Sequence, residues 1–292
     1  MPFRSPPSVR VVLPIALGAT LACASPFATD VVSYIPGSNI NPDFTNPLTA
    51  LGSPERVTGE LVGFPGPVNP FNPPFGSDEI VSVGEGGSLT VRFDQPVIND
   101  PLNPFGIDLL IFGNSFFGIS DFNDAPNGVV TGAFTEGGLV QVSADGVSFV
   151  TVPNAQADGV FPTLGFQDLV DPFASSPGLI PTDFTRPVDP ALDPTGLNLA
   201  QLSLAYNGSG GGAGIDLDDV GLQSITHVRI LNLDGSGVAP EIDAFADVSA
   251  IPAPATLPAT LAALGLLAAT RRRRHSPAAR NNSERPIGAP HG

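Results

Sequence analysis

The sequence contains no lysine and no tryptophan, and its single cysteine, Cys23, lies near the N-terminus. One cysteine cannot form an intrachain disulfide, so core burial, with or without a metal ion, must stabilise the fold. His227 is the only histidine between the two terminal segments, whereas zinc sites need clusters of Cys and His. No nucleophile motif accompanies it, so we expect no catalytic triad, no enzyme, and a structural role for His227 on a strand.

The missing tryptophan also bears on sugar binding, because a sugar ring usually stacks on an aromatic side chain. Only Tyr34 and Tyr206 are present besides 19 phenylalanines. This disfavours a lectin, although phenylalanine can take the same role.

Positively charged residues are nearly absent from the middle of the chain. Between Ser25 and Ala250, four arginines face 27 acidic residues, which leaves a formal net charge of −23. Such a field repels nucleic acid and favours solubility and cation binding. Calcium sites, adaptation to salty water and an ordinary acidic secreted surface all fit this balance.

The N-terminus has the pattern of a secretory signal peptide, residues 1–24. Two arginines precede the apolar run Val11–Ala22, and Ala22-Cys23-Ala24 matches a cleavage site. The alternative is a lipoprotein leader acylated at Cys23, although Thr20 stands where that signal has a large aliphatic residue.

The C-terminus carries a second apolar segment. Ile251–Thr270 contains no charge and is followed by Arg271, Arg272, Arg273 and Arg274. About twenty apolar residues can cross a bilayer, and arginines remain on the cytoplasmic side. We therefore predict a transmembrane anchor with the domain outside, and a disordered tail at 275–292; a buried helix is the alternative.

The region between these segments, residues 25–250, has the short alternating runs of strands. Leu89, Val91 and Phe93 alternate with polar residues, and Ile107–Phe112 is apolar on both faces, as in a covered central strand. Asp145-Gly146 separates two alternating runs, as in a tight hairpin. Further strands are expected at 30–35, 199–206, 225–231 and 242–249, and loops at 118–138, 153–197 and 207–214. We predict an all-β fold: a single jelly-roll-like β-sandwich with long Pro/Gly-rich loops.

A calcium site is the metal site that the acidic residues favour. Asp216, Asp218 and Asp219 lie beside a glycine-rich loop, and Asp108 and Asp243 on other strands could complete the six to eight oxygen ligands that Ca²⁺ takes. The alternative is a solvated acidic turn. The same acids, or Glu79 with Glu85, would also provide the carboxylate pair of a glycoside hydrolase.

The C-terminal pattern resembles the PEP-CTERM sorting signal of bacteria. Pro252-Ala253-Pro254 precedes the apolar segment and the arginine cluster, although the signal usually has Glu where Ala253 stands and ends soon after the basic residues. The resemblance implies export, transient anchoring and processing by an exosortase-like membrane enzyme.

The body of the chain resembles bacterial cell-surface proteins with galactose-binding-like or jelly-roll domains. The similar pieces include VSVGEGGSLTVRFDQPVIND, IDLLIFGNSF and VQVSADGVSFV. We expect a structural or adhesive protein of the cell envelope or extracellular matrix, with polysaccharide or other envelope components as partners. A Ca-dependent carbohydrate-binding module is the second hypothesis, and a carboxylate-pair hydrolase is the third.

The charge imbalance leads to a first prediction. Added sodium chloride should raise the melting temperature of the protein, because salt screens the repulsion among its carboxylates. Thermal unfolding over a series of salt concentrations measures this effect, and a melting temperature that does not respond to salt contradicts it.

Overall fold

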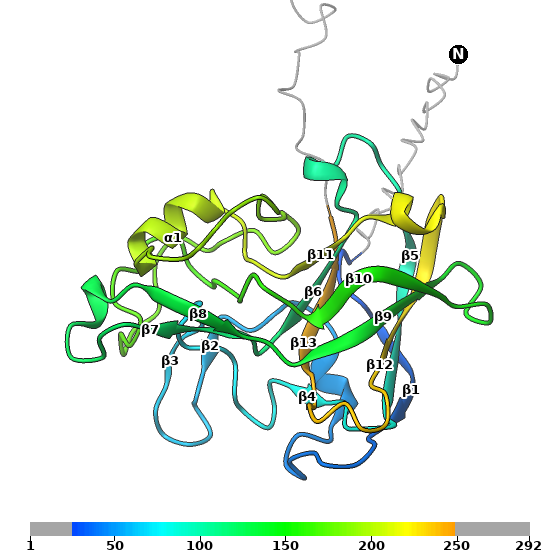
Figure 1. The fold of residues 1–292 in the computed structure, drawn as a ribbon, viewed down its shortest axis with the longest axis horizontal. Helices are drawn as coiled ribbons and strands as arrows, with labels where there is room; N and C mark the ends of the chain where they lie inside the picture. Colours follow the sequence, from blue (N-terminus) through cyan, green and yellow to red (C-terminus); the bar gives the residue numbers. More distant parts are fainter. Residues whose placement is uncertain (1–24, 249–292) are drawn as a thin grey trace, which may run out of the picture. The chain divides into compact units, whose positions relative to one another are not determined.

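The computed structural model describes residues 25–248, whose strands are drawn in Figure 1. The elements follow in the order β1 (Asp30–Ile35), η1 (Pro47–Ala50), β2 (Val57–Thr58), β3 (Gly66–Pro67), β4 (Val81–Ser82), β5 (Ser88–Ile98), η2 (Pro104–Gly106), β6 (Leu109–Gly113), β7 (Phe116–Ile119), η3 (Ala125–Asn127), β8 (Val130–Phe134), β9 (Gly137–Ser143), β10 (Val150–Asp158), α1 (Leu199–Tyr206), β11 (Ala213–Ile215), η4 (Leu217–Val220), β12 (Ser224–Leu231) and β13 (Glu241–Asp247). The described part is mostly β, which confirms the all-β prediction.

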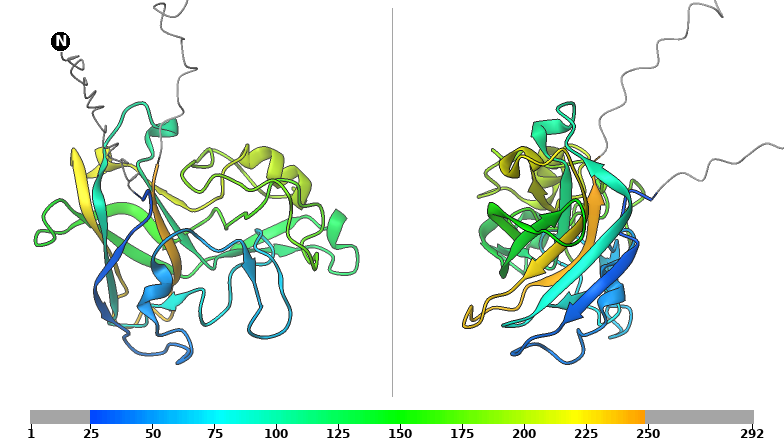
Figure 2. Two further views of the ribbon diagram at one scale, coloured as in Figure 1. Left: turned by 180° about the vertical axis from the view of Figure 1, so that it is seen from behind. Right: turned by 90° about the vertical axis from the view of Figure 1, so that its right-hand side faces the viewer.

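Two antiparallel sheets form the body of the domain (Figures 1 and 2). One has five strands in the order β1-β5-β12-β9-β10, and the other has four in the order β11-β6-β13-β4. Side chains from both sheets form one core cluster, so the sheets pack face to face like a sandwich. Two-stranded ribbons, β2-β3 and β7-β8, extend from this body.

Alternation within the five-stranded sheet explains which side chains fill the core. Leu89 and Val91 of β5 point inward beside Val228 of β12 and Val140 of β9, and all four are fully buried. Arg92, which follows Val91 in the sequence, is exposed on the outer face. The predicted strand and hairpin patterns are confirmed here, with Gly146 at the hairpin turn in a positive-φ conformation (φ 72°).

Strand β6 is buried on both faces, as its apolar sequence predicted. Leu109 and Ile111 join the core shared by the two sheets. Leu110 and Phe112 point the other way, and the ring of Phe112 meets that of Phe184 edge to face at 5.4 Å between centroids. The four-stranded sheet therefore lies between the five-stranded sheet and a layer made by the chain that follows β10.

The chain after β10 also contains a helix at residues that we predicted as a strand, and it packs in a separate cluster with Phe117 and Val130 of the β7-β8 ribbon. Helix α1 buries Leu199, Leu202, Ser203 and Tyr206, a spacing of three to four residues that matches a helical face. A reciprocal capping box between Asn198 and the residue three positions later starts the helix. The strand prediction at 199–206 is therefore wrong, because the helical period was overlooked.

Two predicted loops are also more ordered than expected. Residues 118–138 include most of the β7-β8 ribbon, in which Phe117 pairs with Ala133. In the glycine-rich stretch 207–214, residues 209–212 are buried: Gly211 packs against the backbone of residues 161–162, and Gly212 packs against the ring of Phe112.

The predictions for the two ends lie outside the described residues. These are the signal peptide at 1–24, the anchor and basic cluster at 251–274, and the tail at 275–292. Within residues 25–248, no helix is long and apolar enough to cross a membrane.

The buried glycine-rich stretch generates a prediction with a matched control. Gly211 and Gly235 both have positive φ (88° and 74°), but only at Gly211 would a Cβ meet backbone, at the carbonyl oxygen of Pro162. We expect Gly235→Ala to lower the free energy of unfolding by about 1 kcal/mol through backbone strain. Gly211→Ala should lower the free energy of unfolding by about 2–4 kcal/mol, because overpacking against the Pro162 carbonyl adds to the backbone strain. Urea denaturation measures both, and equal costs would contradict the packing described here.

Candidate functional site

The candidate site is a pocket of about 440 Å³ where the ends of several strands meet. Asn114 and Ser115 follow β6, the β7-β8 ribbon provides one wall, and the connection from β8 to β9 provides another. The last residue of β10 and the first of β13 complete it. The lining residues are Asn114, Ser115, Phe116, Ala133, Phe134, Thr135, Glu136, Asp158, Val238 and Glu241.

Three carboxyl groups line this pocket, and none of its lining residues is a cation. Asp158 is fully buried; its Oδ1 accepts a hydrogen bond from the backbone N–H of Ser115 (2.8 Å) and its Oδ2 one from that of Glu136 (3.3 Å). Burial raises the pKa of Asp158 to about 7 although these backbone donors act in the opposite direction. A Cβ on Gly113 would lie 2.6 Å from Asp158 Oδ1, so only glycine permits this approach.

The two glutamates of the pocket are also partly desolvated. Burial, and to a smaller extent the charges of Glu241 and Asp158, raise the pKa of Glu136 to about 7. Burial raises the pKa of Glu241 as well, although its carboxylate accepts hydrogen bonds from Ser82 Oγ (2.8 Å) and from Asn114 Nδ2. The pocket therefore holds carboxyl groups that keep protons near neutral pH.

An aromatic pair forms the apolar wall of the pocket. The rings of Phe116 and Phe134 pair across the β7-β8 ribbon and stack at 4.7 Å between centroids, with 14° between their planes. Phe116 is 37% and Phe134 58% exposed, so neither ring belongs to the core. A flat apolar surface beside groups that can donate and accept hydrogen bonds is suited to a ligand with both apolar and hydroxyl-bearing faces.

The structure brings some of the predicted calcium ligands together. Asp108 is fully buried just before β6; its Oδ1 accepts from Asp100 N (3.0 Å) and Asn103 Nδ2 (2.9 Å), and its Oδ2 accepts from Leu217 N (3.0 Å). Backbone and amide donors thus occupy both of its oxygens.

Three further predicted ligands lie in and before η4. Asp216 caps it, with its Oδ1 accepting from the N–H of Asp218 (2.8 Å), and Asp218 Oδ1 accepts from Asn99 Nδ2 (2.6 Å). Asp218 and Asp219 are exposed. Burial raises the pKa of Asp216, as do the charges of Asp108 and its two acidic neighbours.

Asp243 does not join this group. It is almost fully buried within β13, and its two carboxylate oxygens accept from the backbone N–H of Glu55 (3.3 and 3.0 Å). Asp247 pairs with Leu109 in the β13–β6 register, so Asp247 and not Asp243 lies beside Asp108. Four residues of strand separate the two acids of β13, about 13 Å.

Calcium binding stays a prediction. Within residues 25–248, no group of three or more His, Cys, Asp or Glu side chains is arranged to hold a metal ion. In the structure, Asp216 caps η4 and Asp218 accepts a hydrogen bond from Asn99.

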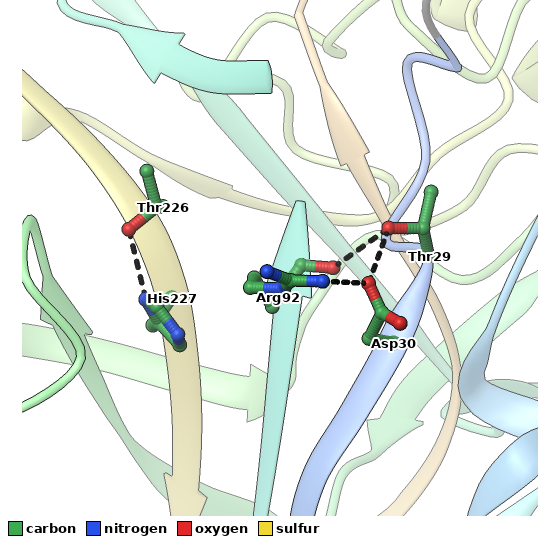
Figure 3. A network of polar contacts seen from close by, with 5 residues as sticks. All are labelled: Thr29, Asp30, Arg92, Thr226 and His227. Atoms are coloured by element: carbon green, nitrogen blue, oxygen red, sulfur yellow. Dashed lines mark hydrogen bonds and ion pairs between the residues drawn. The ribbon is translucent and has the colours of Figure 1, made fainter. Parts of the chain in front are cut away.

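His227 lies in the outer polar row of the five-stranded sheet (Figure 3). It stands opposite Arg92, which forms an ion pair with Asp30 at 2.8 Å. His227 Nδ1 is 2.8 Å from Thr226 Oγ1, and burial together with the charge of Arg92 lowers the pKa of the imidazole. Ser143 lies opposite on β9, but its hydroxyl donates to an aspartate at the hairpin turn and contributes to that turn instead.

Comparison with models of protein families gives no match for this chain, and comparison with curated proteins gives none either.

The pocket residues were not among the predicted site residues. Glu136, Asp158 and Glu241 stand far apart in the sequence, and each lies in an ordinary strand-end context. The pairing of β9 with β10 sets Asp158 opposite Gly137, next to Glu136, and Glu241 joins them from β13 of the other sheet. The sequence offered one usable signal, the Gly113-Asn114-Ser115 turn directly after the most apolar strand.

The raised pKa values generate a prediction about pH and stability. Because the folded pKa values of Glu136 and Asp158 lie above their unfolded values, the folded state binds more protons, and stability should rise as the pH falls from 8 to 5. Glu136→Gln removes one of these groups while keeping the side-chain shape. We expect this variant to be more stable than the unmodified protein at pH 8, with a weaker dependence on pH.

Chemical denaturation at several pH values measures this effect. Glu60→Gln is the matched control, because Glu60 is exposed and lies outside the pocket. One pKa unit corresponds to about 1.4 kcal/mol, so even part of the shift at Glu136 is measurable. Identical pH profiles for Glu136→Gln and Glu60→Gln would contradict the interpretation of the pocket.

Proposed function

We propose that this chain is an exported, membrane-anchored adhesive protein of the cell envelope, and that the pocket beside Phe116 and Phe134 binds a saccharide. The observation that carries this proposal is the exposed, stacked phenylalanine pair in one pocket with three carboxyl groups. We further infer that the sandwich is jelly-roll-like, which the antiparallel pairing of both sheets supports.

The chemistry of a sugar fits both parts of the pocket. A pyranose presents C–H groups on one face, which pack on an aromatic ring, and hydroxyl groups around its edge. A protonated carboxyl group can donate and accept a hydrogen bond, whereas an ionised one can only accept. Glu136, which is half-buried and has a pKa of about 7, supplies both forms near neutral pH.

The cellular location is inferred from the sequence. A signal peptide, an apolar segment of twenty residues and an arginine cluster support export with the domain outside. The similarity of the C-terminal pattern to PEP-CTERM signals supports an exosortase-like enzyme as a processing partner. Polysaccharide of the envelope or matrix is the adhesive partner, and nucleic acid is disfavoured by the charge.

Glycoside hydrolysis is a second candidate function. The observation that favours it is the pKa of about 7 at Glu136 and at Asp158, because a general acid must be protonated near the working pH. Calcium-dependent saccharide binding is a variant of the main proposal. In this variant, Asp108 and Asp216 would be calcium ligands at a site outside the saccharide pocket.

A glycan array tests the proposed function. The unmodified protein should bind a subset of neutral glycans, and Phe134→Ala should weaken binding about tenfold, or ~1.4 kcal/mol, because it removes the more exposed of the two stacked rings. Phe64→Ala is the matched control: Phe64 is 81% exposed but lies outside this pocket.

Three comparisons decide between the alternatives. Binding that is lost in the presence of a chelator supports the calcium-dependent form. Release of shorter sugars from bound glycans, abolished by Glu136→Gln, supports hydrolysis. An equal loss of binding in Phe64→Ala and Phe134→Ala, or no glycan bound at all, would refute the pocket as a saccharide site.

A further inference from the structure

The loop between β5 and β6 lies at the end of the sandwich where the described chain finishes. In Figures 1 and 2 this loop, which contains η2, protrudes beside the end of β13. The N–H of Val248 donates to the carbonyl of Asp108 (2.9 Å), directly after the loop. The N–H of Asp247 donates to the carbonyl of Pro26 (2.7 Å), so both ends of the described chain are located here.

The loop turns its polar side chains inward and its apolar side chains outward. Asn103 is buried and bonds to Asp108, and Asp100 Oδ1 accepts from the N–H of Leu102 (2.9 Å). Leu102 is 78% and Phe105 54% exposed. This arrangement is the reverse of what water favours, and polar contacts at its base hold it in place.

The backbone of Phe105 is strained in a way that keeps its ring outside. Its φ of 60° is in the left-handed region, which costs a non-glycine residue roughly 1–2 kcal/mol. Phe105 gains no core burial in return. A strained backbone that presents an exposed aromatic ring is a feature of binding surfaces.

Chain length limits how far this loop can lie from the proposed anchor. All twenty residues of Ile251–Thr270 are needed to cross about 30 Å of hydrocarbon as a helix. Val248 lies only three residues before Ile251, a reach of at most about 11 Å. The polar headgroup layer on each side is about 5–7 Å thick. If Ile251 enters the hydrocarbon, Val248 must therefore lie within about 4–6 Å of the headgroup layer, so a loop that protrudes at this end of the sandwich reaches the headgroups.

We propose that Leu102 and Phe105 insert into the headgroup region of the outer membrane leaflet beside the C-terminal anchor. This contact rests on the anchoring part of the proposed function and adds a second, non-covalent attachment that orients the domain. Asp100 and Asp218 lie at the same end, with Asp218 held to the loop base through Asn99. They disfavour an anionic surface, so the proposed partner is a neutral, zwitterionic lipid layer.

The absence of tryptophan from the chain makes the experiment direct. Phe105→Trp and Leu102→Trp each introduce a single fluorophore into the full chain, reconstituted in phosphatidylcholine vesicles. Phe64→Trp is the control, because the β2-β3 loop lies on the other side of the domain in Figures 1 and 2. With lipid brominated near the headgroup, we expect about half of the emission at 105 and 102 to be quenched and none at 64.

The possible outcomes separate the two proposals. If the chain co-floats with vesicles but neither Phe105→Trp nor Leu102→Trp is quenched, the loop contact is refuted and the anchor is retained. Equal quenching at Phe64→Trp and Phe105→Trp also refutes it. If the full chain does not co-float with vesicles, the anchor and the loop contact both fail. Two separate tryptophan positions, each checked by circular dichroism, keep the test valid if one variant folds poorly.

Discussion

The constraint on which this structure depends is that its acidic groups have almost no cations to pair with. Between residues 25 and 248, 27 acids face four arginines, and Arg92 with Asp30 forms the one ion pair in that part of the chain. An isolated charge is costly to bury, so each buried carboxylate must be stabilised by hydrogen-bond donors or be protonated. The domain contains carboxylates stabilised by hydrogen-bond donors and carboxyl groups whose pKa is raised so that they can keep a proton.

Donors from backbone and neutral side chains stabilise the structural carboxylates. Asp108 accepts from two backbone N–H groups and an amide, and ties the β5–β6 loop to η4. Glu79 accepts from the backbone N–H groups of Phe75 (3.0 Å) and Gly76 (2.8 Å) and from a threonine hydroxyl. These acids fix connections that the chain cannot fix with disulfides.

The carboxyl groups of the pocket represent the other solution. Burial raises the pKa of Glu136, Asp158 and Glu241, and at Asp158 and Glu241 it outweighs the hydrogen bonds that they accept. This set of groups lies at the start of β13, whereas the proposed membrane contact lies at its end. Six residues of strand separate the two ends, about 20 Å, so the saccharide pocket would face away from the bilayer.

The sequence predicted the elements whose periodicity is local. The alternation in β5 and β12, the two-sided apolar run of β6 and the Asp-Gly turn between β9 and β10 were sufficient to place five strands and the sandwich core. Helix α1 was missed because its buried residues, Leu199, Leu202 and Tyr206, follow a three-to-four spacing within only eight residues. The pocket was missed because its acids meet through the β9–β10 register and the packing of the two sheets, which no single stretch of sequence specifies.

The most direct test of this account is a ¹³C NMR titration of the side-chain carboxyl carbons of Glu136 and Asp158. The account predicts that both titrate with apparent pKa values of about 7, because they are buried without a cation. Values near 4 for both carboxyl groups, as in free side chains, would contradict it.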